Sequence, residues 1–286
     1  MIIIDGKKAS AELRAGLKEQ VAQLKKQGVE PGLATILVGE DPASQVYVAN
    51  KIKACAELGI RSFHHPLAAT STESEIIALI QKLNADVSVH GILLQLPLPS
   101  GTPSEKCLDA IAPAKDIDGL HPYSIGQLVS AKSWKEIEQR KLLLPCTPHG
   151  VIILLKKYGI EIAGKHAVVV GRSNLAGKPV AMMLLANNAT VTVAHSQTRD
   201  LAAVCRQADI LVAAIGKPNF VTKDFVKPGA AVIDVGINRT KDGLCGDVDY
   251  NGVKDIAGFL TPVPGGVGAM TITMLMQNTI LASQKE

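Results

Sequence analysis

The chain has 286 residues, a net charge of +4 at pH 7, and 47% hydrophobic but only 3% aromatic residues. This length suits one large or two medium domains, and the aliphatic composition is typical of an α/β protein. No apolar run approaches the roughly 18 residues of a membrane span, and no basic block alternates with aromatic residues. We therefore expect neither a membrane nor a nucleic-acid partner.

The cysteines argue against disulfide bonds, and the histidines argue against a metal site. Five cysteines, an odd number, are scattered without a C-x-x-C motif, which is typical of reduced thiols in a cytoplasmic protein without a signal peptide. Seven histidines show no H-E-x-x-H or similar spacing, so the sequence predicts no metal site.

The first half of the chain alternates short aliphatic runs with amphipathic segments. Thr72 and Glu75 form a capping box before one of these segments. Such alternation predicts a parallel sheet with right-handed crossovers and flanking helices. The expected strands are residues 2–4, 33–38, 60–64 and 89–94, and the expected helices include one that ends near Gly28 and one over residues 44–58.

The helix over residues 44–58 carries a candidate acid/base pair. Ser44, Tyr47 and Lys51 stand at positions i, i+3 and i+7, and therefore share one helix face. A lysine and a phenol near the ends of parallel strands can exchange protons with a ligand. The alternative is a half-buried tyrosine beside a lysine that extends to water.

Two polar residues follow buried stretches in the first half. Gln95 comes directly after an expected strand, at the carboxyl edge where open α/β sheets bind ligands. An amide between Leu94 and Leu96 needs partners for both its donor and its acceptor. Asp118, in the motif D-I-D-G, either accepts from the N–H groups of a heterocycle or forms an Asx turn.

A domain boundary is expected near residue 145. Thr147 can cap a helix that carries Pro148 at its first position and ends at Gly159. We therefore predict a first domain over residues 1–144 and a second over 145–269, with a last helix over 270–286 that packs back on the first domain. The second domain should contain strands over 168–170, 190–194, 210–214 and 231–235, and a rigid, glycine-rich loop over 261–268.

The start of the second domain resembles a mononucleotide-binding unit. The β-branched run at 168–170 leads into a glycine turn, G-R-S-N-L-A-G, and Pro179 suits the first turn of the following helix. Strand, glycine turn and helix place a helix N-terminus where a phosphate can bind. Because the turn reads G-x-S-x-x-x-G rather than G-x-G-x-x-G, an ordinary βα turn is the alternative.

The next strand end bears on cofactor choice. A site specific for NAD has a carboxylate about 20 residues after the glycines, but this chain has no Asp or Glu between Glu161 and Asp200. Arg172 lies in the turn instead, and Ser196 occupies the place of the carboxylate. A guanidinium and a hydroxyl suit a 2′-phosphate, which predicts NADP; the alternative is a set of surface polar residues at a strand end.

Six motifs occur in a fixed order along the chain: S-x-x-Y-x-x-x-K, Q-L-P-L-P, K-D-I-D-G, P-C-T-P-x-G, V-V-V-G-R-S and T-P-V-P-G-G-V-G. Over essentially its whole length the chain closely resembles the bifunctional methylenetetrahydrofolate dehydrogenase/cyclohydrolase family. This resemblance implies two α/β domains, each a mostly parallel sheet with flanking helices, the second Rossmann-like. It also implies NADP-dependent oxidation of methylene-tetrahydrofolate, hydrolysis of the methenyl product to formyl-tetrahydrofolate, and a homodimer built largely through the nucleotide domains.

The resemblance also assigns roles to residues. It implies that Tyr47 stacks near the folate, Lys51 is the catalytic lysine, Gln95 tunes that lysine, and Asp118 holds the pterin. Further folate contacts are implied for Leu96, Pro264, Gly265, Gly266, Val267 and Gly268, and NADP contacts for Gly171, Arg172, Ser173 and Ile237, in addition to Ser196.

The chain departs from the family's pattern at two places, and two other functions remain as alternatives. Ala269 replaces the family's proline after P-G-G-V-G, which predicts a less rigid loop, and residues 134–144 form a longer and more charged link than usual. One other function is a two-domain NADP-dependent dehydrogenase of hydroxy or keto acids, for which no obvious His or Arg site is present. The other is a non-catalytic, nucleotide-binding regulatory subunit, against which the face of Tyr47 and Lys51 argues.

Overall fold

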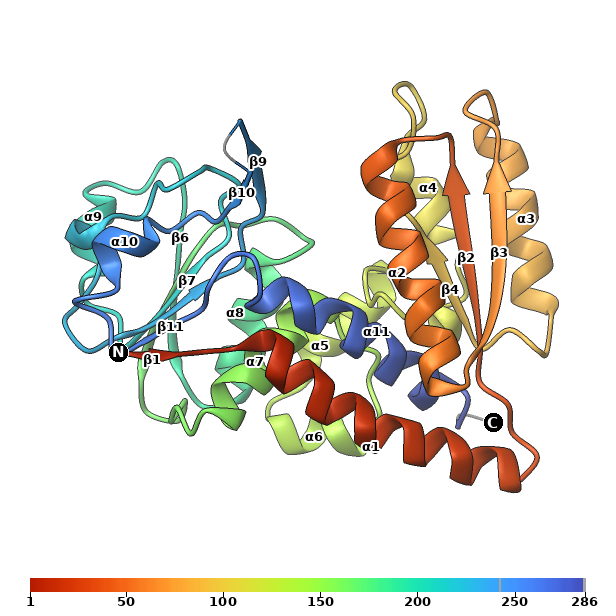
Figure 1. Cartoon of the computed structure of the whole chain (residues 1–286), viewed down its shortest axis with the longest axis horizontal. Coiled ribbons are helices and arrows are strands. Elements are labelled where there is room, and N and C mark those ends of the chain that lie inside the picture. Colours follow the sequence, from red (N-terminus) through yellow and green to blue (C-terminus); the bar gives the residue numbers. More distant parts are fainter. Residues whose placement is uncertain (242, 285–286) are drawn as a thin grey trace. The chain divides into compact units, whose positions relative to one another are not determined.

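The structure, a computed structural model, describes residues 1–241 and 243–284 (Figure 1). It separates into two compact units, each assembled from several stretches of chain. Unit 1 contains Met1–Ala11, Gln127–Arg140 and Pro145–Met274, and unit 2 contains Glu12–Gly126, Lys141–Leu144 and Leu275 onward. Among the described residues, no helix is both long and apolar enough to cross a membrane.

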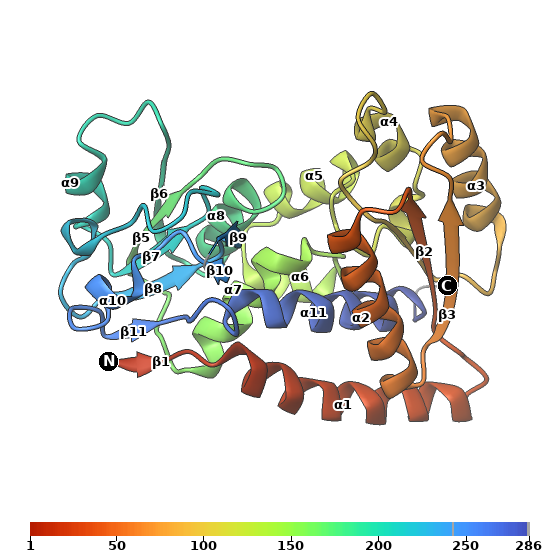
Figure 2. The same cartoon turned by 45° about the horizontal axis from the view of Figure 1, so that its top comes forward.

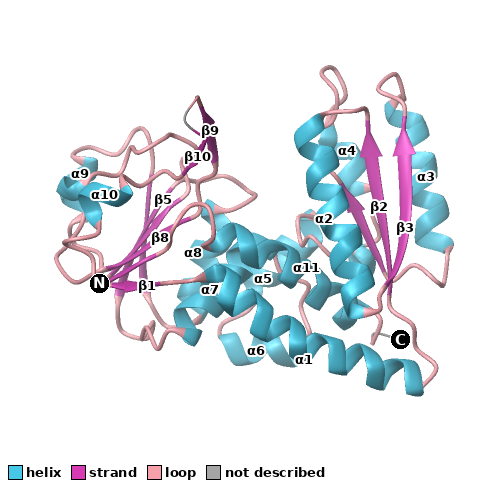
Figure 3. Ribbon diagram, in the orientation of Figure 1, coloured by secondary structure: helices cyan, strands magenta, loops and turns pink. Residues whose placement is uncertain are grey.

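Unit 1 is built on a six-stranded parallel sheet in the order β1-β11-β8-β7-β5-β6. The central strands are buried at nearly every position because helices cover both faces, as the ribbon of Figure 3 shows. The strands are β1 (Ile2–Ile3), β5 (His166–Val170), β6 (Thr190–Ala194), β7 (Ile210–Ala213), β8 (Ala231–Asp234) and β11 (Phe259–Leu260). The α/β class and the Rossmann-like second half predicted from the sequence are confirmed.

The helices of unit 1 are mostly short. They are α6 (Trp134–Gln139), α7 (Cys146–Lys157), α8 (Gly177–Ala186), α9 (Leu201–Cys205) and α10 (Tyr250–Val253), with a 3₁₀ turn at Lys223–Phe225. A separate antiparallel pair joins β9 (Asn238–Thr240) and β10 (Gly243–Cys245). The predicted cap of α7 was wrong: its N-cap is Pro145 without a side-chain cap, and Thr147 Oγ1 instead bonds Thr271 Oγ1 at 2.9 Å.

The first residues of the chain pack with the second half of the sequence, in unit 1. Ile2 and Ile3 pair with Phe259 and Leu260, which extends the sheet by one edge strand. At Gly6 the chain passes so close to another segment that a Cβ would lie 2.0 Å from the carbonyl oxygen of Gly266. Glycine is therefore required where α1 (Gly6–Lys26) begins.

Unit 2 contains a three-stranded parallel sheet in the order β3-β2-β4. Figures 1 and 2 show α2 and α3 on either side of this sheet. The strands are β2 (Gly32–Val38), β3 (Arg61–Leu67) and β4 (Gly91–Leu94), and the helices include α2 (Pro42–Leu58), α3 (Glu73–Ala85), α4 (Ser104–Asp109) and α5 (Pro122–Ser130), with a 3₁₀ turn at Pro113–Lys115. The central strand, β2, is buried at all seven positions.

Local signals fix both ends of the helix that carries the candidate acid/base pair. The Asp41 carboxylate accepts from the Ser44 backbone N–H at 2.8 Å and caps the start of α2. Gly59 ends the helix in the left-handed conformation, with φ of 79°. The capping box of Thr72 and Glu75 at α3 is confirmed, with both of its hydrogen bonds present.

The last helix, α11 (Val267–Ala282), begins three residues before the predicted Met270. Its second half belongs to unit 2, where Asn278 Nδ2 donates to the carbonyl oxygens of Ile117 and Leu144, each at 2.8 Å. In unit 1, Thr273 Oγ1 pairs with Ser10 Oγ at 2.6 Å. Residues 285–286 of the predicted helix lie outside the described residues.

Candidate active site

Lys51 and Gln95 lie together in unit 2. Lys51 Nζ donates to Gln95 Oε1 at 2.8 Å, while Gln95 Nε2 donates to the Leu96 carbonyl oxygen at 2.6 Å. The Gln95 backbone N–H donates to the Ile36 carbonyl oxygen at 2.9 Å. These bonds satisfy the donor and the acceptor of the amide and fix which face it presents to the lysine.

The sheet explains why residues 44 positions apart meet. Ile36 on β2 pairs with Leu94 on β4, so the two strands end at the same edge of the sheet. Gln95 follows β4 directly, and α2 starts shortly after β2. Tyr47, one helical turn before Lys51, is 45% exposed and offers a flat, accessible ring on the same helix, whereas Ser44 is buried. A lysine, an oriented amide and an exposed ring together can bind a planar heterocycle and move a proton.

The D-I-D-G segment runs beside β4, because Asp116 forms an isolated parallel bridge with Ile92. Asp116 is buried, and its carboxylate accepts from the backbone N–H of His121 at 2.9 Å and from Ser124 Oγ at 2.7 Å. The first aspartate of the motif therefore organises the start of α5. Asp118, two residues later, is half-buried.

A cavity of about 300 Å³ opens in unit 1 at the carboxyl ends of β5, β6 and β7. Strand order reverses here, since β6 and β7 flank β5 on opposite sides, and open α/β sheets bind ligands at such a point. Four of the predicted cofactor residues line it, whereas Ile237, which is 48% exposed, is not among its lining residues. The lining consists of Val170, Gly171, Arg172, Ser173, His195, Ser196, Leu201, Ala214, Ile215, Lys217 and Phe220.

The glycine turn is shaped by two close approaches. Gly171 has φ of +131°, and a Cβ there would lie 2.1 Å from the carbonyl oxygen of Ala214. A Cβ on Gly177 would lie 2.2 Å from the Gly171 carbonyl oxygen. Ser173 Oγ accepts from the backbone N–H of Ala176 at 3.2 Å and closes the turn. Both glycines are therefore required by the backbone, which leaves the turn open toward the cavity.

The charges of this cavity suit an anionic dinucleotide. Its lining contains Arg172, Lys217 and His195 and includes no aspartate or glutamate. Arg172 and Ser196 are both exposed, from the ends of β5 and β6. A carboxylate that would repel a 2′-phosphate is thus missing from the lining, and a guanidinium that can bind one is present.

The P-G-G-V-G segment ends differently from expectation, because Val267 and Gly268 already form the first turn of α11. The loop before them contains a cis peptide bond between Val263 and Pro264. The Gly265 carbonyl oxygen accepts from the Lys7 backbone N–H at 3.1 Å. Ala269 donates its backbone N–H to the Gly266 carbonyl oxygen at 3.2 Å, a bond that proline could not make, so the substitution adds a local constraint to the loop.

Sequence reasoning missed two buried aspartates beside the cavity. Asp247 accepts hydrogen bonds from the backbone of Ile215 and Lys217, both of which line the cavity, and Asp234 binds the backbone of Asp247. The available signal was the pair of motifs D-V-G and G-D-V, in which each aspartate is close to a glycine. Burial raises the pKa of Asp234 to about 6.

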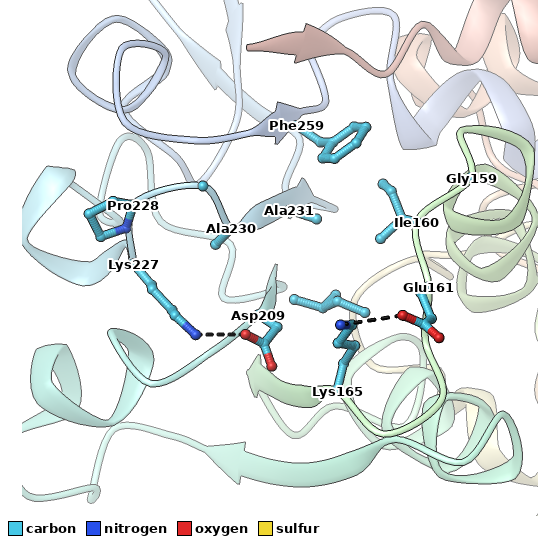
Figure 4. Close-up of a pocket in the computed structure, with 12 residues that line it drawn as sticks. Gly159, Ile160, Glu161, Lys165, Asp209, Lys227, Pro228, Ala230, Ala231 and Phe259 are labelled. Carbon is cyan, nitrogen blue, oxygen red and sulfur yellow. Dashed lines mark hydrogen bonds and ion pairs between the residues drawn. The ribbon is translucent and has the colours of Figure 1, made fainter.

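A second hollow of about 270 Å³ lies at the opposite, amino-terminal edge of the same sheet (Figure 4). Its charged groups pair with one another: Lys227 Nζ lies 2.7 Å from Asp209 Oδ1, and Lys165 Nζ lies 3.4 Å from Glu161 Oε2. These pairs neutralise the rim, and the amino-terminal edge is not where parallel sheets bind their ligands. Within residues 1–241 and 243–284, no group of three or more His, Cys, Asp or Glu side chains could hold a metal ion.

The fold and the two sites define an α/β enzyme that combines a dinucleotide cavity with a lysine and amide pair suited to proton transfer. Residues 4–118 match the family model described as tetrahydrofolate dehydrogenase/cyclohydrolase, catalytic domain, and residues 145–286 match the NAD(P)-binding domain of the same family. The chain belongs to the tetrahydrofolate dehydrogenase/cyclohydrolase family, which confirms the resemblance seen in its motifs.

Individual relatives agree over the full length. The bifunctional protein FolD of Moorella thermoacetica is 57% identical over 99% of both chains. The FolD crystal structure from Campylobacter jejuni is 47% identical over 99% of both chains, with a TM-score of 0.94. The Trypanosoma brucei dehydrogenase-cyclohydrolase, solved with NADP cofactor and inhibitor, is 40% identical with a TM-score of 0.91 and covers 99% of this chain and 97% of its own.

Proposed function

We propose that this chain oxidises methylene-tetrahydrofolate to methenyl-tetrahydrofolate with NADP and then hydrolyses the product to formyl-tetrahydrofolate. The observation that carries this proposal is the 2.8 Å hydrogen bond between Lys51 and Gln95, in a chain that matches both domains of a dehydrogenase/cyclohydrolase family. Family membership also argues against a hydroxy-acid dehydrogenase and against a non-catalytic regulatory subunit.

The dinucleotide cavity supports the first reaction. Bound NADP would accept the hydride that leaves the methylene carbon, and the folate nitrogens stabilise the resulting cation. The turn from Gly171 to Ser173 lets a pyrophosphate approach the backbone, while Arg172 and Ser196 bind the 2′-phosphate. The trypanosomal relative was solved with NADP, which supports this assignment. The protein's own contribution to this step is to position the two reactants.

The second reaction needs a group that moves protons. A water oxygen bonds to the methenyl carbon and loses both of its protons, while the bond from that carbon to one folate nitrogen breaks. The departing nitrogen takes up one of these protons, and the other is released to solvent, so the cationic substrate becomes a neutral formyl product. We assign the proton movements to Lys51 Nζ. The positive charge of the bound substrate disfavours the protonated lysine, and Gln95 Oε1 orients the amine without adding a negative charge that would favour protonation.

The other assigned residues bind the folate. The exposed ring of Tyr47 stacks on it, Asp118 accepts from the N–H groups of the pterin, and Leu96 lies beside the amide of Gln95. We further assign folate contacts to the loop from Pro264 to Gly268 and an NADP contact to Ile237. We therefore assign folate chemistry to residues 1–144 with the last helix, and cofactor binding to residues 145–269.

The direct test of the cofactor is the rate of methylene-tetrahydrofolate oxidation with NADP and with NAD. We expect a clear preference for NADP, and a reduction of that preference by about tenfold or more in Arg172→Ala, because one charge-assisted bidentate contact is lost. Arg206→Ala is the matched control, since Arg206 lies outside the cavity and donates to the Asp224 carbonyl oxygen. A preference for NAD in the unmodified protein overturns the cofactor assignment.

We also propose that the chain forms a homodimer and functions in the cytoplasm. Strand β6 is an edge of the larger sheet, and Val193 on it is 39% exposed, so a second copy would cover unpaired backbone groups. None of the five cysteines, which all lie within the described residues, forms a disulfide, and this suits a reducing compartment. Light scattering should give about twice the 30.1 kDa chain mass, and a monomeric mass contradicts the dimer.

A further inference from the structure

Asp247 occupies the centre of a hydrogen-bond network behind the dinucleotide cavity. Its side chain is fully buried. Oδ2 accepts from the backbone N–H groups of Ile215 at 2.6 Å and Gly216 at 2.9 Å, and Oδ1 accepts from that of Lys217 at 2.9 Å. Asn238 Nδ2 also donates to Oδ1, at 2.9 Å. One carboxylate therefore fixes three consecutive peptide groups of the segment that follows β7.

Asp234, at the end of β8, holds Asp247 in turn. Its Oδ1 accepts from the backbone N–H groups of Gly236 at 3.0 Å and Asp247 at 2.9 Å, and its Oδ2 accepts from that of Val248 at 2.9 Å. Its own backbone N–H donates to Thr261 Oγ1 at 2.7 Å. The two carboxylates thus act in series: Asp234 fixes the backbone of Asp247, and Asp247 fixes the segment after β7.

Two glycines make room for this arrangement. A Cβ on Gly236 would lie 2.2 Å from Asp247 Cγ, and a Cβ on Gly246 would lie 1.8 Å from Asp234 Oδ2. The Asp247 carboxylate therefore packs on the backbone of Gly236, two residues after Asp234. The Asp234 carboxylate packs on the backbone of Gly246, which directly precedes Asp247. Any other residue at either glycine would displace the carboxylate it touches.

The segment that Asp247 holds is one wall of the dinucleotide cavity. Ala214, Ile215 and Lys217 line the cavity, and the Ala214 carbonyl oxygen is the atom that a Cβ on Gly171 would strike. The glycine turn is the other wall. Because the two walls touch at Gly171, the position of the segment sets the shape of the space between them.

We propose that Asp247 and Asp234 are positioning residues for the dinucleotide: they hold residues 214–217 against the glycine turn and thereby set the affinity of the cavity for its cofactor. This inference rests on the proposed NADP site. It also gives a role to two carboxylates that lie in the interior, where burial and the charge of Asp247 both raise the pKa of Asp234. An ionised carboxylate has only acceptors, and each hydrogen bond described above for these two carboxylates comes from an N–H donor.

The test compares Asp247→Asn with Asp249→Asn. The asparagine at 247 keeps the shape of the side chain but turns one acceptor into a donor that faces N–H groups. We expect the KM for NADP to rise about ten- to hundredfold, the loss associated with a charged hydrogen bond. We expect kcat at saturating NADP, the KM for folate and the cyclohydrolase rate to change less than about twofold, the ordinary result for a residue that acts only on cofactor binding.

Asp249 is the matched control because it lies two residues away and caps α10, accepting from the Gly252 backbone N–H at 3.2 Å, outside the network. Its asparagine variant should leave the KM for NADP unchanged. An unchanged KM in Asp247→Asn overturns the inference. A loss of cyclohydrolase activity in parallel with dehydrogenase activity shows a folding defect instead.

In that case Asp234→Asn carries the test. Its remaining oxygen can keep the bonds to Gly236 and Asp247, and only the bond from Val248 is lost. We expect a smaller rise in the KM for NADP, about threefold or more, with cyclohydrolase activity retained; no rise overturns the inference. The unmodified protein is assayed first with both dinucleotides, since an absence of dehydrogenase turnover there contradicts the proposed function rather than the role of the aspartates.

Discussion

Replacing Asn278 by leucine tests how the last helix, α11, stabilises unit 2. Asn278 is almost fully buried, and its Nδ2 donates to the carbonyl oxygens of Ile117 and Leu144, each at 2.8 Å. Leucine has the same branched arrangement of four side-chain heavy atoms, although its methyl groups are bulkier, and it donates nothing. A buried carbonyl that loses its partner costs about 1–3 kcal/mol, and the added apolar surface returns about 1 kcal/mol. Because two carbonyls are affected, we expect the free energy of unfolding to fall by about 1–5 kcal/mol.

The assay is urea unfolding followed by loss of cyclohydrolase activity. With a urea dependence of about 2 kcal/mol/M, the midpoint should fall by about 0.5–2.5 M. Thr279→Val is the matched control, because Thr279 is also buried on α11 and its hydroxyl donates within the same helix, to the Leu275 carbonyl oxygen. We expect that variant to shift the midpoint by less than about 0.5 M. Equal midpoints for Asn278→Leu and the control would refute the role of the two long-range bonds.

The same variant should affect function. Ile117 directly precedes Asp118, which we propose to hold the pterin, so release of its carbonyl oxygen should loosen that segment. In the absence of urea, we expect Asn278→Leu to raise the KM for the folate substrate severalfold and to leave the KM for NADP unchanged. A change confined to the KM for NADP would contradict this assignment.

Three further predictions follow from single residues. Gly171→Ala should abolish NADP binding but preserve cyclohydrolase activity, because its Cβ would lie 2.1 Å from the Ala214 carbonyl oxygen; titration with NADP measures this, and unchanged affinity contradicts it. Burial lowers the pKa of His149 to about 4, so the unfolded chain binds a proton that the folded chain does not, and stability falls by about 3 kcal/mol as the pH drops from 6.5 to 4. His149→Leu should remove this loss of stability, which is measured as the unfolding free energy at each pH from the fluorescence of Trp134, the only tryptophan. The raised pKa of Asp234 makes stability rise as the pH falls, but it does so equally in both proteins. Thr72→Ala should cost about 1 kcal/mol through the capping box, and an unchanged thermal midpoint argues against that bond.

Elements with strong local signals could be predicted from the sequence. The β-branched run of β5, the glycine turn after it and the capping box of Thr72 each depend on a few neighbouring residues, so their pattern is visible in one stretch. The same holds for the shared face of Tyr47 and Lys51, which follows from helix geometry alone. The proximity of Gln95 to Lys51 can also be inferred from the sequence, because parallel strands place their carboxyl ends at one edge of the sheet.

Features that depend on distant partners were not predictable in this way. Strand β1 has only two residues, and its place in the sheet is set by Phe259 and Leu260, more than 250 positions away. The cap of α7 was mispredicted because Thr147 bonds Thr271 instead of its own helix. The network of Asp234 and Asp247 joins four separate segments, and a lone aspartate in the sequence is equally consistent with an exposed turn.

The measurement that tests the proposed function most directly is the absorbance of methenyl-tetrahydrofolate during turnover by the unmodified protein and by Lys51→Met. In the unmodified protein, we expect the methenyl intermediate to form with NADP and then decay. In Lys51→Met, which loses the amine held 2.8 Å from Gln95, hydrolysis of added methenyl-tetrahydrofolate should fall by at least about 100-fold while NADP still binds. Hydrolysis at the unmodified rate in Lys51→Met would contradict the role of Lys51 and the mechanism built on it.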